Sequence, residues 1–441
     1  MTRKIAGQLA VRSARSLRTA FGMPDGLPLR LWLASLALVW AVAVPVVWLL
    51  WCGRRFDLVQ HEVAAWRPFT VLMAPEAVAI LWRLRRARVF QAVVVVTGIC
   101  LFSWLMNQGP FWLLGRFWLY VWLLLFALAC AGWAGKVAPA LGLRVFFAAK
   151  LGMTLFAMAL FAAVLVQFGT LHGAFSSPPI FCNIRHFDFA LVVVLGVGLA
   201  WLGGASRDAR GGLHGAAAIA LFVAAGYFLV WSGGRGGMLA FGVTWAMLWW
   251  RAERAGRRVL HRALGLLAVS AVLVLATGQG EFFLSQLLRM GADSLNAMSS
   301  SRLAIWGEAL QRWAAGGVPG MLFGYEPDAF FGFGIGRALD PDIVQPHNAL
   351  IQFLLEFGLA GTAVIVAAWA WLLRRCFRVL RQPHGVDVTS CVAALLVGLS
   401  VYAQVDGVLY HVVPLTAVAF LVAWFVRAGP VAARSPAMLG R

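Results

Sequence analysis

The sequence predicts an all-α integral membrane protein with about twelve transmembrane helices and one large loop on the outer side. Of its 441 residues, 62% are hydrophobic and only 12% are charged, and the mean hydropathy is +0.82. These values lie far outside those of an ordinary soluble domain. Several apolar runs reach the roughly 20 residues that cross a bilayer as a helix, and they are continuous, unlike the alternating segments of a membrane β-barrel.

The first expected helix covers residues 31–52. Its apolar run is longer than a signal-peptide core and is followed by Arg54 and Arg55, so we expect a retained helix. The other apolar runs, all bounded by polar or basic residues, predict further spans near 68–82, 89–107, 117–135, 145–171, 186–206, 215–232, 238–250, 263–277, 349–373, 389–405 and 412–426.

The distribution of positive charge predicts the orientation. Basic stretches such as "RLRRAR" at 83 and "RRCFRVLR" at 374 fall on alternate connections, which together hold most of the 37 lysines and arginines. This is the positive-inside bias, so both termini are expected in the cytoplasm, and the net charge of +20 does not indicate nucleic-acid binding. The expected organisation is a basic N-terminus (1–30), helices 1 to 9 (31–277), an outer loop (278–348), helices 10 to 12 (349–426) and a cytoplasmic tail (427–441).

The outer loop is expected to contain ordered structure. The stretch "SSSRLAIWGEALQRWAAGG" begins with serines suited to capping, and Leu303, Trp306, Leu310 and Trp313 follow at helical spacing. An amphipathic helix lying on the bundle or at the membrane surface is therefore predicted. The glycine-rich stretch "FGYEPDAFFGFGIG" that follows predicts a loop whose backbone approaches a neighbour closely.

Two arginines at the outer ends lack an acid nearby in sequence. Arg235 stands within "SGGRGG", where glycine N–H groups and a planar guanidinium suit a phosphate oxygen; the alternative is a flexible turn between two helices. Arg302 stands in the first turn of the predicted loop helix, where the helix dipole disfavours a cation but favours a bound anion. By contrast, Arg312 has Glu308 four residues before it, a spacing that predicts an ion pair.

The stretch "QPHNALIQFLLEFGLAG" places His347 just before the helix that Asn348 can cap. The helix dipole favours a neutral imidazole there, which can accept a proton from a hydroxyl nucleophile; the alternative is a cap-region histidine bonded to backbone. Weaker candidates at other outer ends are Arg185, His186 and Asp188 in "NIRHFDF" and Asp406 in "QVDGVLYH". Two carboxylates within expected spans, Glu76 and Glu356, are either structural or functional.

Metal and cofactor chemistry are not expected. The 6 cysteines form no CxxC pair, which argues against a soft metal site or a disulfide framework. The sequence contains no GxxxxGK[ST] nucleotide loop. "DPD" at Asp340–Asp342 has the shape of a metal-binding acidic pair, but acids flanking a proline are common in loops.

Taken in order, "SGGRGG", "SSRLAIW", "LFGYEPDAF" and "HNALIQFLLEFGLAG" resemble the C-terminal signature of the O-antigen ligase and O-antigen polymerase superfamily, over residues 225–375. Members usually have serine directly before the arginine of the first piece, where this chain has Gly234. The resemblance implies a GT-C-like fold and transfer of a glycan from undecaprenyl diphosphate at the periplasmic side of the bacterial inner membrane. A single large outer loop resembles the ligases, whose acceptor is lipid A-core.

The resemblance also implies roles for individual residues. Arg235 and Arg302 would hold the diphosphate and His347 would activate the acceptor hydroxyl. The expected partners are undecaprenyl diphosphate-linked O-antigen, lipid A-core oligosaccharide and membrane lipids, without nucleic acid, metal or cofactor. The alternatives are a polymerase or protein O-oligosaccharyltransferase of the same superfamily, or a flippase or exporter of the same lipid-linked glycan. The residues implied to bind substrate are Arg185, His186, Tyr325, Asn348 and Asp406.

Overall fold

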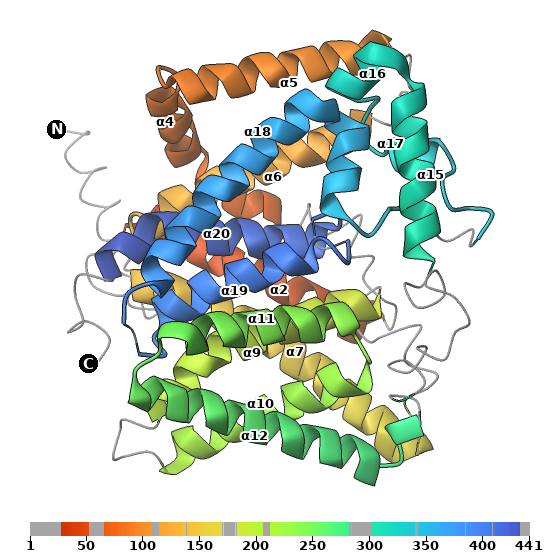
Figure 1. Ribbon diagram of the computed structural model, residues 1–441. Helices are drawn as coiled ribbons and strands as arrows, with labels where there is room; N and C mark the ends of the chain where they lie inside the picture. The colour runs from red at the N-terminus through yellow and green to blue at the C-terminus, as the bar shows by residue number, and fades with distance from the viewer. Residues whose placement is uncertain are drawn as a thin grey trace, which may run out of the picture.

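The computed structural model of the chain is a bundle of helices (Figure 1). It describes residues 28–52, 66–106, 114–137, 139–169, 171, 181, 183–205, 212–281, 284, 301–339, 343–383, 385–407 and 409–432. Arg54, Arg55, the pair Asp340 and Asp342, most of the basic N-terminus and residues 433–441 therefore lie outside the described residues.

A helix occupies part or all of each range in which a span is expected, and no β-strand occurs in the described ranges. The helices that correspond to the expected spans are α2 (Leu29–Cys52), α4 (Ala74–Leu84), α5 (Arg88–Met106), α6 (Leu114–Ala134), α7 (Pro139–Phe168), α9 (Ile184–Ala205), α10 (Gly212–Trp231), α11 (Arg235–Arg251), α12 (Arg254–Ala276), α18 (Ala349–Leu380), α19 (Val388–Tyr402) and α20 (Val412–Ala432). Three further helices, α15 (Arg302–Ala315), α16 (Gly317–Phe323) and α17 (Ala329–Gly332), belong to the expected outer loop.

Several of these helices are apolar enough for a membrane. Within the described part of the chain, four segments have both the length and the hydropathy to cross one, namely Lys150–Phe168, Ile184–Gly204, Arg254–Ala276 and Ala349–Leu380. Shorter apolar helices include Gly215–Trp231 and Val388–Tyr402. The protein is thus an all-helical chain with helices suited to a membrane.

The centre of the bundle is formed by α9, α11 and α19, which pack through small residues. A Cβ on Gly398 of α19 would collide with Thr244 and with the backbone of Ala240 in α11, and one on Gly236 would meet the Tyr402 ring at 2.7 Å. Glycine therefore lets α11 and α19 approach closely, as is common between membrane helices. This packing brings the N-terminus of α11, with Arg235, beside the end of α19.

Helix α18 bends at Gly358, which has φ 60° and ψ −169° inside the helix. The bend gives α18 two straight pieces (Figure 1). A Cβ on Gly358 would collide with the backbone of Leu322 to Gly324, and Tyr325 N donates to Leu355 O at 2.9 Å. The close backbone approach predicted for "FGYEPDAFFGFGIG" is confirmed at Gly324, and it joins the outer-loop helices to α18.

The predicted loop helix is confirmed as α15, and its predicted apolar stripe is covered in part. Trp306 and Trp313 pack against the buried Ile305 and Ala309, whereas Leu303 and Leu310 are 47% and 41% exposed. Ser301 precedes α15 in a left-handed conformation and its side chain makes no capping hydrogen bond. The buried side of α15 packs against Phe330, Ile335 and the first turns of α18, so tertiary contacts decide which apolar residues are covered.

The prediction of an ion pair between Glu308 and Arg312 is wrong, because no such contact occurs among the described residues. Glu308 Oε2 instead accepts a hydrogen bond from Gly336 N at 3.0 Å. Arg312 is exposed at the far end of α15. The acid therefore stabilises the turn that follows α17 rather than the helix that contains it.

Candidate functional site

Three polar side chains from distant segments meet at one end of the bundle. Arg185 Nη1 lies 2.7 Å from Nδ1 and 3.0 Å from Nε2 of His347, and 3.5 Å from Asp406 Oδ1. His347 Nδ1 lies 3.3 Å from the same carboxylate oxygen. Arg185 begins α9, His347 precedes α18 and Asp406 follows α19, so the cluster joins three helix ends. We call these residues, together with Arg302, the outer cluster.

The segment around His347 is held in place by backbone contacts. His347 has φ 53°, a left-handed conformation that is uncommon for a residue with a side chain. Before it, Pro346 O accepts from Trp306 Nε1 of α15 at 2.7 Å. After it, Asn348 caps α18 by accepting from Ile351 N at 3.1 Å, and Ala349 N donates to Ala403 O at 2.8 Å. These bonds place the imidazole between the outer loop and the end of α19.

Asp406 is the acid of the cluster. It is 8% exposed, and its Oδ1 also accepts from Gly407 N at 2.7 Å. Burial by itself would raise the pKa of Asp406, but the hydrogen bond from His347 and the positive charges of Arg185 and Arg302 outweigh burial and hold that pKa well below its ordinary value. Asp406 is therefore a carboxylate at neutral pH.

His347 is neutral in this setting. Burial lowers its pKa below the ordinary value of 6.5, and Arg185 and Arg302 lower it further, while Asp406 acts in the opposite direction. Since a guanidinium only donates and a carboxylate only accepts, the ring has to accept from Arg185 and donate to Asp406. Arg185 Nη1 lies within 3.0 Å of both ring nitrogens, whereas Asp406 contacts Nδ1, so we assign Nδ1–H to Asp406 and the Nε2 lone pair to Arg185. The ring thus presents its basic nitrogen to a cation.

Arg302 lies within electrostatic range of the other charges. Burial lowers the pKa of its guanidinium, Asp406 raises it, and Arg185 and Arg235 lower it again. An arginine nevertheless stays protonated in a protein. Arg185, Arg235 and Arg302 together carry more charge than the Asp406 carboxylate offsets, so this end of the bundle has a local positive excess suited to an anion.

The glycines around Arg235 have packing roles as well. A Cβ on Gly234 would collide with the Asp188 carboxylate, and Gly237 lies against Leu229 and Val192. The sequence-based interpretation assigned these glycines to phosphate binding. The structure gives Gly234, Gly236 and Gly237 close neighbours of their own, while Arg235 stands at the first position of α11.

Two other candidates lie beside the cluster. The His186 ring is buried, with its centroid 4.5 Å from that of His411, and Gln345 Nε2 lies 2.8 Å from His411 Nε2. The side chain of Asn348 caps α18, and its Nδ2 donates to Gln404 O at 3.1 Å. Both residues therefore support the positions of the surrounding segments.

The structure does not bring Tyr325 to the outer cluster. Its hydroxyl donates to Arg312 O at 3.1 Å and Trp313 O at 3.0 Å, at the end of α15 opposite Arg302. Ten residues of helix separate Arg312 from Arg302, a rise of about 15 Å. The ring packs against Gly316 and Gly320, so Tyr325 joins α15 to α16.

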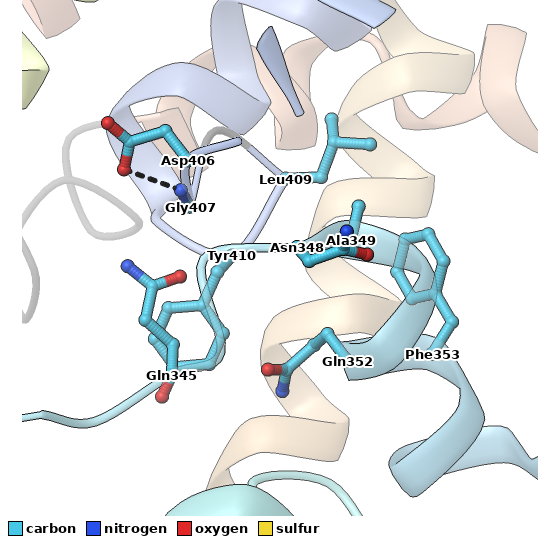
Figure 2. A pocket seen from close by; sticks show the side chains of 9 residues that line it. All are labelled: Gln345, Asn348, Ala349, Gln352, Phe353, Asp406, Gly407, Leu409 and Tyr410. Atoms are coloured by element: carbon cyan, nitrogen blue, oxygen red, sulfur yellow. Dashed lines mark hydrogen bonds between the residues drawn. The ribbon is translucent and has the colours of Figure 1, made fainter. Parts of the chain in front are cut away.

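A narrow pocket opens next to Asp406, between the first turns of α18 and the turn after α19 (Figure 2). Gln345, Gln352 and Tyr410 line it, and sequence reasoning did not single out any of the three. The signal that could have found the glutamines is their position in "QPHNALIQ", on either side of His347. Tyr410 gave no such signal, because only the fold brings it there.

Glu356, singled out from the sequence, is a structural junction. It is fully buried, and it accepts from Gln352 Nε2, from Asp328 N at 3.0 Å and from Tyr120 OH at 2.5 Å. Asp328 in turn accepts from Tyr410 OH at 2.9 Å. The carboxylate thereby connects α6, α18 and the outer loop.

Glu76, the other acid within an expected span, pairs with Arg30 and with Lys136 Nζ at 2.7 Å. Arg30 and Lys136 belong to connections expected on the cytoplasmic side. Within the described ranges, no group of three or more His, Cys, Asp or Glu side chains is placed to hold a metal ion.

Comparison with known proteins gives no relative. No protein-family model matches the chain, and no curated protein is significantly similar to it.

Proposed function

We propose that this chain is an O-antigen ligase, which transfers a glycan from undecaprenyl diphosphate to a sugar hydroxyl of lipid A-core on the periplasmic side of the bacterial inner membrane. The observation that supports this most is the outer cluster, where a neutral, partly buried histidine bonded to a carboxylate stands among arginines in positive excess. Such a group combines a base with an anion-binding site. The resemblance of "SGGRGG" and "HNALIQFLLEFGLAG" to the superfamily supports the same activity.

The residues fit the chemistry of the transfer. The acceptor hydroxyl oxygen attacks the anomeric carbon, the bond from that carbon to the diphosphate oxygen breaks, and the hydroxyl proton passes to Nε2 of His347. The lipid diphosphate leaves with the bonding electrons, and Arg235 and Arg302 stabilise its charge. Asp406 keeps Nδ1 of the ring protonated and stabilises the imidazolium that forms.

Arg185 affects when His347 can act, because its guanidinium donates a hydrogen bond to Nε2, the basic nitrogen of His347. An acceptor hydroxyl has to replace that contact before it can lose its proton. A diphosphate beside the cluster attracts Arg185, since a charge-assisted bond to phosphate is stronger than one to a neutral ring. Binding of the donor thus draws Arg185 away and frees Nε2 of His347 to accept the proton.

The distribution of charge supports transfer over transport. Arg185, His347 and Asp406 come from connections that the positive-inside bias assigns to one side. Arg30 and Lys136, from connections assigned to the other side, pair with Glu76. A flippase or exporter needs polar groups along a path through the spans, whereas Arg185, His347 and Asp406 lie at helix ends.

The test is reconstitution. Purified protein in lipid nanodiscs, given undecaprenyl diphosphate-linked O-antigen and lipid A-core, is expected to form glycan joined to the core, detected as a mass increase of the core. Omitting lipid A-core separates the alternatives, because a polymerase then lengthens the glycan on the donor. Elongated donor without ligated core, or movement of the donor across vesicles without any transfer, contradicts the proposal.

A further inference from the structure

The pocket beside Asp406 differs in character from the positively charged part of the outer cluster. Its polar lining residues are Gln345, Asn348, Gln352, Tyr410 and Asp406, with Phe353 among the apolar ones. Among the described residues that line it, none is a lysine or an arginine. The polar groups of this pocket are thus neutral or negative.

Gln352 provides a hydrogen-bond acceptor without a partner. The side chain is 4% exposed, and its Oε1 has no donor among the described residues. Its Nε2 donates to the Glu356 carboxylate. Because a carboxylate accepts only, the amide cannot be reversed without placing two acceptors against each other. The orientation of Gln352 is therefore fixed, with Oε1 left for another group.

Each of the other two amides already uses one of its N–H groups. Asn348 Nδ2 donates to Gln404 O at 3.1 Å, and Gln345 Nε2 lies 2.8 Å from His411 Nε2. An orphaned acceptor buried beside a carboxylate favours a hydrogen-bond donor and repels an anion. The pocket is therefore unsuited to phosphate and suited to a neutral hydroxyl.

The dimensions of the pocket limit its ligand. The space left free in it is about 10 Å³, room for roughly one water-sized group. Sites for whole small molecules measure roughly 300–1,000 Å³. A single hydroxyl group fits this space, and a sugar ring does not. Figure 2 shows Gln352 extending from α18 toward the side of the pocket that Gln345 and Tyr410 form.

We propose that this pocket receives one hydroxyl group of the acceptor glycan, with Gln352 Oε1 accepting from that hydroxyl. The proposal rests on the proposed function and assigns the substrate class of this subsite. The acceptor is favoured over the donor glycan because the pocket shares Asp406 with His347, the base that must meet the acceptor. The arginines that suit the diphosphate are not among its lining residues.

The test measures binding rather than transfer, so that it does not depend on activity. Purified protein in nanodiscs is titrated calorimetrically with delipidated core oligosaccharide and, separately, with O-antigen oligosaccharide that lacks the diphosphate. The variant is Gln352→Met, which keeps the length of the side chain and removes the amide. Loss of one hydrogen bond is expected to weaken core binding about three- to tenfold and to leave O-antigen binding unchanged.

Two control variants separate this role from a structural one. Gln404→Met removes another amide whose Oε1 is buried and unpartnered, but Gln404 does not line the pocket. Tyr120→Phe removes a different hydrogen bond to Glu356 and leaves the pocket intact. Both variants are expected to bind core oligosaccharide as the wild type does.

Three results would overturn the proposal. They are unchanged core binding in Gln352→Met, weakened binding of O-antigen oligosaccharide instead, and equal losses in Gln352→Met and Tyr120→Phe. Absence of core binding by the wild type would also overturn it. Failure of the proposed function is recognised separately, as absence of ligated product in the transfer assay despite measurable binding of core.

Discussion

His347 is subject to opposing electrostatic influences whose balance sets its charge. Burial, Arg185 and Arg302 favour the neutral ring, while Asp406 favours the protonated one. The net effect lowers the pKa of His347 below 6.5. A general base works only in its neutral form, so this environment suits His347 to the proposed role of base at neutral pH.

The pH dependence of transfer tests this balance. Activity is lost as the pH falls through the pKa of His347, so the acidic limb of kcat/KM is expected to have its midpoint below pH 6.5. Arg185→Met removes a positive charge, which raises the pKa of His347 and moves that midpoint upward. Asp406→Asn removes the opposing negative charge and moves it downward, with a lower maximal rate. Midpoints that stay in place, or that move in the same direction, would show that another group titrates.

Arg302 is expected to need a guanidinium rather than merely a positive charge. A bidentate bond to diphosphate contributes on the order of 1.5–3 kcal/mol, and a lysine replaces only part of it. Arg302→Lys is therefore expected to lower kcat/KM at least tenfold, with Arg235→Lys behaving alike.

Arg312→Lys is the matched control, because Arg312 is exposed on the same helix. It is expected to leave kcat/KM unchanged. Wild-type rates in Arg302→Lys, measured with limiting donor, would remove Arg302 from the diphosphate site.

At the scale of the helices, hydrophobic runs predicted the position of the elements but not all of their contacts. Helices coincide with the ranges expected to span, because burial of about 20 apolar residues dictates them. The apolar stripe of α15 was predicted in part. Trp306 and Trp313 pack against the core of the loop, but Leu303 and Leu310 stay exposed, because the packing of Phe330 and Ile335 against α15 selects the buried side.

Gly358 is the element-scale feature most sensitive to substitution. Its φ of 60° is strained for any side chain, and a Cβ there would collide with the backbone of Leu322 to Gly324. Gly358→Ala is therefore expected to separate α16 from α18 and to lower the midpoint of thermal unfolding by several degrees. Faster proteolysis between α15 and α17 is expected as well.

Gly265→Ala in α12 serves as the control, since a Cβ at Gly265 meets nothing within 4 Å. It is expected to leave the unfolding midpoint unchanged or slightly higher, because alanine favours a helix over glycine. Equal effects of the two substitutions would mean that the bend in α18 does not depend on Gly358.

Across the whole molecule, individual site residues could be predicted from the sequence, but the contacts between them could not. The positive-inside bias assigned Arg185, His347 and Asp406 to the same side, yet 162 residues separate the first two. No sequence pattern reveals that Arg185 contacts the imidazole of His347. Tyr325 was predicted to bind substrate because its stretch resembles a family motif. In the fold, its hydroxyl instead donates to backbone carbonyls of α15.

The orientation of the whole chain remains a prediction with a direct test. In a background without the native cysteines, Val318→Cys on α16 and Arg258→Cys on α12 place one thiol each at an exposed position. A membrane-impermeant maleimide applied to cells with permeabilised outer membranes is expected to label the first variant. The second is expected to react only after the inner membrane is disrupted. The opposite pattern would invert the topology and place the outer cluster in the cytoplasm.

The proposed mechanism depends on one claim: a single cluster divides transfer between arginines that hold the diphosphate and a histidine that activates the acceptor. The most direct measurement compares donor affinity with single-turnover transfer in His347→Asn, chosen because asparagine tolerates the φ of 53° at this position. Donor affinity is expected to stay within about threefold of wild type, since His347 contributes no charge to diphosphate binding, while transfer falls by about 100-fold or more, the scale of a lost general base. Transfer at the wild-type rate, or a loss of donor affinity as large as that of Arg302→Lys, would contradict the claim.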